Sequence, residues 1–189
     1  MRAQTLTQAV IGHEGLVRKA GLILGGSLFI ALAAQVSVPF FPVPLTLSTL
    51  AILIVGLTFG ARLGAATLLA YLAQGAMGLP VFAGGMSTAA LVGPTAGFLY
   101  GFVGMAWLAG LAVEKGLARG VIPTALCGIA ISALLYIPGL AWPAAVMGKA
   151  APELWAYWMA PFLLGDLVKA VIAAMLVAGG WKLIAARKG

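Results

Sequence analysis

Long stretches without a single charge constrain this chain more than any other feature of its sequence. Four apolar stretches lie between the charged clusters, at residues 20–61, 63–113, 120–148 and 154–181. A typical soluble domain has about 25% charged residues, whereas this chain has 8% and is 63% hydrophobic. So few charges cannot cover a soluble fold, and the single cysteine, Cys127, excludes a disulfide-stabilised one. The sequence therefore predicts an all-α integral membrane protein.

The number of membrane spans follows from the length of these stretches. A spanning helix needs about 20 mainly apolar residues, so the two longest stretches hold two helices each and the others one each. The proline-rich segment 39–44 and the glycine-rich segment 78–94 interrupt helices, and residues 139–153 are expected to form the longest loop. The six expected helices lie near residues 20–38, 44–60, 63–78, 95–113, 120–138 and 158–182.

The basic residues indicate how the chain is oriented, because Lys and Arg concentrate in cytoplasmic loops. With both termini in the cytoplasm, only Lys149 lies outside and Lys169 lies within a span. The nine on the inner side are Arg2, Arg18, Lys19, Arg62, Lys115, Arg119, Lys182, Arg187 and Lys188. We therefore expect a cytoplasmic or interfacial segment at residues 1–19, a six-helix membrane domain at 20–184 and a basic cytoplasmic tail at 185–189. We expect a multi-pass protein of a cytoplasmic membrane, and this orientation accounts for most of its net charge of +7 without a nucleic-acid partner.

Two charges, Asp166 and Lys169, remain inside the sixth expected helix, where they share a face. Trp155 and Trp158 are expected at the outer membrane interface, which places Asp166 about 12 Å deep at 1.5 Å per residue. Charges at such depth cost at least about 2.5–3.5 kcal/mol each. The pair therefore favours a ligand or ion path over an ion pair that only ties helices together. A carboxylate beside an ammonium group suits a compact polar head such as a cyclic urea.

Uncharged polar residues inside the expected spans are weaker candidates for the same site. Gln35 lies late in the first expected helix, while Tyr71 and Gln74 lie late in the third and could share a face. Each of these side chains could instead bridge two helices, which is the commoner role of an amide or phenol in a membrane.

Hydroxyl side chains near the two interrupting segments form a further group of candidates. Thr46, Ser48 and Thr49 follow the prolines, where they could cap the second helix or line a pocket. Gly84 permits close backbone approach, so this part of the chain, with Ser87 and Thr88, could bind an anionic group. Most glycine-rich loops are only turns, so this signal is weak alone.

Other residue patterns exclude several kinds of chemistry and indicate close helix packing. His13 is the only histidine, so neither a metal site nor a serine–histidine enzyme is predicted, and the chain has no P-loop. No cofactor is expected. The small-residue pairs Gly21/Gly25 and Ser27/Ala31 let helices approach closely. They could pack the six helices together or dock another membrane protein.

Five short motifs follow one another along the chain. They are Val43-Pro-Leu-Thr-Leu, Tyr71-Leu, Gly78-Leu-Pro-Val-Phe-Ala-Gly-Gly85, Gly93-Pro-Thr-Ala-Gly-Phe-Leu-Tyr-Gly-Phe102 and Gly165-Asp-Leu-Val-Lys-Ala170. Together, over roughly residues 30–180, this ordered set resembles the BioY family. That family comprises the biotin-specific substrate-binding, or S, components of energy-coupling factor (ECF) transporters.

The resemblance implies a six-helix S-component fold that binds biotin from outside without catalysis. It implies that Asp166 accepts hydrogen bonds from the ureido N–H groups and that Lys169 donates nearby. It further implies that segments 39–44 and 78–94 act as lids. A transmembrane coupling protein and two ATPases complete such a transporter. The small-residue pairs of the first helix are then the expected docking surface, here Ser27/Ala31 or Gly21/Gly25.

Part of the glycine-rich segment departs from the family pattern. This chain has Met86-Ser87-Thr88-Ala89 where other members are richer in glycine, and Ala96-Gly97-Phe98 where they have Gly-Gly-Tyr. We expect Ser87 or Thr88, with nearby backbone N–H groups, to receive the valerate carboxylate. Four alternatives remain: an S component for another small vitamin, transport without an ATPase module, a membrane enzyme, or a purely structural subunit.

Overall fold

The computed structural model describes residues 5–11 and 15–188, most of them helical. The helices are α1 (Leu6–Ile11), α2 (Leu16–Gln35), α3 (Ser48–Phe59), α4 (Ala61–Ala76), α5 (Ala96–Glu114), α6 (Val121–Met147), α7 (Ala151–Glu153) and α8 (Ala160–Lys188). Between them lie the 3-10 helices η1 (Ala83–Gly85) and η2 (Thr88–Leu91) and the π-helix η3 (Leu154–Met159). Strands β1 (Ser37–Val38) and β2 (Leu45–Thr46) pair antiparallel, with Ser37 opposite Thr46. The prediction of a helical protein is confirmed, with this small hairpin added.

The last two long helices extend beyond the bounds expected from the sequence. Helix α6 continues through Pro138 and Pro143, so the prediction of a long loop at residues 139–153 is wrong. Proline is tolerated in membrane helices because neighbouring groups satisfy the backbone groups that it frees. Helix α6 ends at Met147 and is followed by Gly148, whose left-handed φ of 65° favours glycine. Helix α8 follows η3 directly and includes residues 185–188 of the expected tail.

Within the described residues, four helical segments are long and apolar enough to cross a membrane. They are α2, α5, α6 and the continuous helix Ala151–Ile184. Helices α3 and α4 have 12 and 16 residues, fewer than a full span normally needs. They are separated at Gly60, whose φ is 85°. The second and third expected spans are therefore present as helices, but both are shorter than a typical spanning helix.

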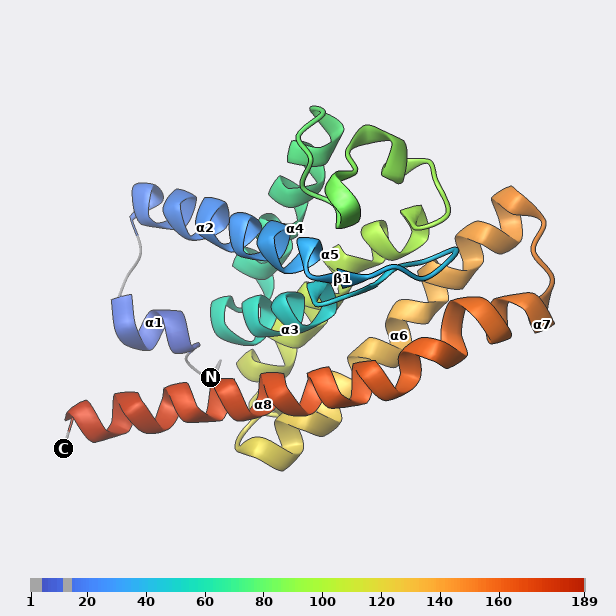
Figure 1. The fold of residues 1–189 in the computed structure, drawn as a ribbon. Coiled ribbons are helices and arrows are strands. Elements are labelled where there is room, and N and C mark those ends of the chain that lie inside the picture. Colours follow the sequence, from blue (N-terminus) through green and yellow to red (C-terminus); the bar gives the residue numbers. More distant parts are fainter. Residues whose placement is uncertain (1–4, 12–14, 189) are drawn as a thin grey trace.

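Helix α5 forms the middle of the bundle. It packs against α3, α4 and α6, while α8 packs along α3 and α6, and α2 packs on α4 (Figure 1). Some of these contacts bring backbones together, since a Cβ on Gly110 would lie 2.1 Å from the Ala61 nitrogen. Trp158 belongs to the hydrophobic core and is 1% exposed. Its side chain therefore packs inside the protein, and its depth in the membrane stays a prediction.

Both ends of the described chain lie at the same end of the molecule (Figure 1). Helix α1 packs against α3 and α8, and the Thr7 hydroxyl donates to the Thr58 carbonyl oxygen at 2.6 Å. The tip of the hairpin and α7 lie at the far end of the molecule from the termini (Figure 1). This arrangement places the loops that join the helices on two sides of the bundle.

Candidate functional site

A cavity is enclosed by the hairpin, by the segment that contains η1 and η2, and by helices α3 to α6 and α8. Its empty volume is about 860 Å³, part of which is open to solvent. Most lining residues are apolar, and the polar ones are Thr46, Ser48, Thr49, Tyr71, Thr95, Tyr136, Asp166 and Lys169. The cavity is therefore suited to an amphipathic small molecule.

One end of the cavity holds a hydrogen-bonded cluster around Asp166. The Tyr136 hydroxyl donates a hydrogen bond to Asp166 Oδ2 at 2.6 Å. Lys169 Nζ lies 3.5 Å from Asp166 Oδ1 and donates to Thr49 Oγ1 at 3.1 Å. The Thr49 hydroxyl is also 3.5 Å from Asp166 Oδ1. The Lys169 and Asp166 side chains are 14% and 11% exposed, so the pair is largely withdrawn from solvent.

Three helices meet to build this cluster. Asp166 and Lys169 lie three residues apart on α8, Thr49 lies in the first turn of α3, and Tyr136 lies on α6 two residues before Pro138. The ammonium of Lys169 has three donors and two partners here, so one donor stays available. The two contacts at Asp166 Oδ1 are long, so this oxygen can also accept from a ligand. The cluster can thus bind a neutral group that presents both an N–H donor and an acceptor.

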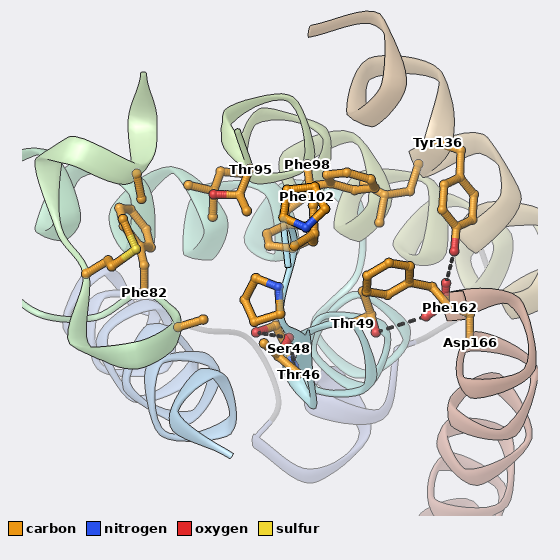
Figure 2. A pocket seen from close by; sticks show the side chains of 18 of the residues that line it. Thr46, Ser48, Thr49, Phe82, Thr95, Phe98, Phe102, Tyr136, Phe162 and Asp166 are labelled. Carbon is orange, nitrogen blue, oxygen red and sulfur yellow. Dashed lines mark hydrogen bonds between the residues drawn. The ribbon is translucent and has the colours of Figure 1, made fainter. Parts of the chain in front are cut away.

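Aromatic rings make up much of the remaining wall. Phe162 lies one helical turn before Asp166 on α8, and its ring meets Phe40 of the hairpin edge-to-face at 6.0 Å between centroids. Phe98 packs in the same manner against Tyr136, also at 6.0 Å. Figure 2 shows Asp166 and Tyr136 at one end of the view, Phe82 at the other, and Phe98 between them. The cavity is therefore polar at the Asp166 end and mostly apolar beyond it.

Two of the predicted site residues hold the loop that carries Phe82. The Gln35 amide donates to the Phe82 carbonyl oxygen at 3.0 Å and accepts from the Gly85 N–H at 3.1 Å. The Tyr71 hydroxyl donates to the Val81 carbonyl oxygen at 3.1 Å. Tyr71 lines the cavity as well, whereas Gln35 does not. Gln35 is therefore a residue that positions the loop, at the edge of the site.

Several other predicted site residues lie outside the cavity. The Gln74 amide donates to Ser27 Oγ at 3.0 Å and ties α4 to α2, so it does not share the cavity-facing side of Tyr71. From the glycine-rich loop, Ala83 and Met86 line the cavity. The predicted members of that loop, Gly84, Ser87 and Thr88, are not part of the lining, and the Thr88 hydroxyl lies 3.3 Å from the Gly75 carbonyl oxygen.

The small-residue pairs of the first helix have different exposures. Ser27 is fully buried and Ala31 is 7% exposed, so this pair cannot form an accessible docking surface. Gly21 and Gly25 are exposed, and a Cβ on either would meet nothing within 4 Å. His13 lies outside the described residues, and among the described ones no group of three or more His, Cys, Asp or Glu side chains could hold a metal ion.

Tyr136 is the member of the cluster that the sequence analysis missed. It lies in a charge-free stretch, where an aromatic residue is normally interpreted as part of the hydrophobic core. One signal was available, because a buried tyrosine hydroxyl needs a hydrogen-bond partner. Asp166 and Lys169 are the only charged side chains expected inside a span, so Asp166 was the strongest acceptor within reach.

We expect Tyr136→Phe to destabilise the ligand-free protein by about 1.5–3 kcal/mol, because the buried Asp166 carboxylate loses its shortest hydrogen bond. The matched control is Tyr100→Phe, which removes a 2.8 Å hydrogen bond from a half-exposed tyrosine and should change stability by no more than about 0.5 kcal/mol. Thermal unfolding of both variants in detergent gives the comparison. Equal losses of stability in the two variants would show that the Tyr136–Asp166 hydrogen bond stabilises the protein no more than the hydrogen bond of Tyr100.

Fold and cavity together define a helical membrane protein with an internal site for a small, partly polar ligand. A family model described as the BioY family matches residues 3–186. The biotin transporter BioY of Rhodobacter capsulatus is 40% identical over 166 residues, which is 81% of this chain and 87% of that protein. The biotin transporter BioY of Rhizobium etli is 36% identical over 84% of this chain and 90% of that protein. The chain belongs to the BioY family.

A solved structure has a fold similar to that of this chain. The crystal structure of the S-component for biotin from an ECF-type ABC transporter matches with a TM-score of 0.73. The match covers 90% of this chain and 95% of that chain at 22% sequence identity. The arrangement of helices described above is therefore an S-component fold.

Proposed function

We propose that this chain binds biotin at the outer side of the membrane as the substrate-specific component of an ECF-type transporter. The observation that carries the proposal is the Asp166–Lys169 pair, with Thr49 and Tyr136, at one end of a largely apolar cavity. Biotin combines a polar cyclic urea with an apolar ring and chain. Such a molecule matches a cavity that is charged at one end and aromatic beyond it.

The ureido ring of biotin is expected at the charged end. Asp166 Oδ1 accepts from a ring N–H, because its present contacts to Thr49 and Lys169 are both 3.5 Å long. Lys169 directs its remaining donor at the ureido oxygen. Tyr136 keeps Asp166 Oδ2 occupied and so holds the carboxylate in place. Phe98, Phe102 and Phe162 then cover the apolar part of the ligand.

Membrane topology and partners form the second part of the proposal. Six crossings, with both termini in the cytoplasm of a bacterial inner membrane, are supported by the common position of the two ends and by the basic residues there. The hairpin tip, whose residues Pro42 and Val43 line the cavity, then faces outward, because it lies at the far end of the molecule from the termini (Figure 1). A coupling membrane protein with two ATPases would use the exposed face of α2 around Gly21, Gly25 and Leu28, which surrounding lipid covers otherwise.

Calorimetry on the detergent-purified protein tests the proposal directly. We expect saturable binding of biotin, and no competition from thiamin or riboflavin, because neither offers a cyclic urea with two N–H donors to the Asp166–Lys169 pair. Thermal unfolding in the presence of each vitamin provides a second measurement, since a ligand that binds the folded state raises the melting temperature. Stabilisation by another vitamin and not by biotin would contradict the proposal.

A further inference from the structure

A second cavity lies beside the first, where α6 ends and α7 begins. Its empty volume is about 590 Å³, and its lining includes Phe41, Pro42 and Pro94 together with Lys149, Glu153 and Trp158. Pro42 lines both cavities, and Pro94 of the second is followed in the chain by Thr95 of the first. The two cavities are therefore neighbours, with the tip of the hairpin and the start of α5 between them.

One face of the last helical segment runs from the second cavity to the charged cluster of the first. Trp158, Phe162 and Asp166 are four residues apart from one another, a spacing that keeps side chains on one face. Trp158 lines the second cavity, whereas Phe162 and Asp166 line the first. Eight residues correspond to about 12 Å along the helix. A bicyclic ring with a four-methylene acid chain has a comparable length.

Lys149 brings a positive charge to the second cavity. Its Nζ lies 2.7 Å from Glu153 Oε1, and the two side chains are 33% and 41% exposed. An ammonium group has three donors, so Lys149 can hold Glu153 and a second acceptor together. Of the Lys and Arg side chains in the described part of the chain, Lys169 lines the first cavity and Lys149 the second. Lys169 already contacts Asp166 and Thr49.

We propose that Lys149 binds the carboxylate of the ligand whose ring is held by Asp166 and Lys169, an inference that rests on the proposed function. The second cavity then takes the acid end of the molecule, and Lys149 selects for a free carboxylate. Ser87 and Thr88, which the sequence favoured for this role, do not line either cavity. Glu153 competes for the same ammonium, so its charge weakens the binding of the acid.

The test compares biotin with its neutral primary amide by calorimetry on Lys149→Gln. We expect this variant to bind biotin about 10- to 100-fold more weakly, the cost of one hydrogen bond to a charged group. Binding of the amide should stay within about twofold of the parent protein, because Lys149 has no charged partner on the amide. Glu153→Gln should bind biotin as tightly as the parent protein or more tightly. Lys182→Gln, an exposed lysine elsewhere on α8, serves as the matched control.

Each other result overturns the inference in a recognisable way. If Lys149→Gln keeps the full preference for the acid over the amide, another group binds the carboxylate. Equal weakening of both ligands would show a general structural role for Lys149. If Lys149→Gln does not fold, a loss of acid preference in Glu153→Gln contradicts the inference independently. Failure of the parent protein to bind either ligand contradicts the proposed function itself, an outcome distinct from these.

Discussion

Replacing the charged pair, as Asp166→Asn with Lys169→Met, should weaken biotin binding by about 30-fold to several thousand-fold. Removing a buried, hydrogen-bonded charge from a binding partner typically costs about 2–5 kcal/mol. Here the ring would lose both the acceptor at Asp166 Oδ1 and the donor at Lys169 Nζ. Calorimetry on the purified double variant measures the change.

The double variant is preferable to either single one. Replacing Asp166 alone would leave the Lys169 charge with only Thr49 as a partner, in surroundings where an unpaired charge is costly. Removing both charges avoids this penalty, so the fold should persist, and circular dichroism can verify it. Lys182→Met is the matched control, because it removes an exposed lysine from the same helix. Tight biotin binding by the double variant would refute the assignment of the site.

The largest loss of stability is expected from Gly110→Leu in the middle of the bundle. A Cβ at this position would lie 2.1 Å from the Ala61 nitrogen and 2.2 Å from the Gly60 carbonyl carbon. These are backbone atoms, so α5 must separate from the turn between α3 and α4. Overpacking a core typically costs about 1–3 kcal/mol, and we expect a loss at or above the upper end of that range. The apparent melting temperature in detergent measures it.

Gly104→Leu provides the comparison for this variant. Gly104 lies on the same helix, is exposed, and has nothing within 4 Å of a built Cβ. The two substitutions make the same change in helix propensity and differ in the space around the new side chain. We expect Gly104→Leu to unfold at or above the temperature of the parent protein. Similar melting temperatures for the two variants would contradict the close packing at Gly110.

Part of the fold follows directly from the order of apolar and charged residues. The helix at Ala96–Glu114 lies within one residue of its predicted bounds, because Pro94 precedes it and charges follow it. The end of α6 was misplaced, because part of the loop expected at residues 139–153 is helical as far as Met147. Local sequence does not show that packing against α5 and α8 stabilises the helix beyond Pro138.

The residues of the candidate site were also predicted only in part from the sequence. Asp166 and Lys169 could be identified from sequence because charge is expensive inside a membrane, and such residues are few. Gln74 and Tyr71 were both predicted as site residues because they are polar residues of one helix. In the structure Tyr71 lines the cavity, whereas Gln74 forms a hydrogen bond with Ser27. Tyr71 and Gln74 are three residues apart on α4, which packs against other helices on more than one side. Their spacing alone therefore does not show which of the two faces the cavity.

The sequence alone determined that the chain is a helical membrane protein and that one charged pair lies within it. Both conclusions depend on the free energy of moving side chains out of water. That free energy is set by the type of side chain and does not require knowing which residues it contacts. Only the tertiary structure decided that Tyr136 and Thr49 complete the pair and that Lys149 stands beside a second cavity. Those contacts join residues about 30 to 120 positions apart, and their geometry depends on how α3, α6 and α8 pack.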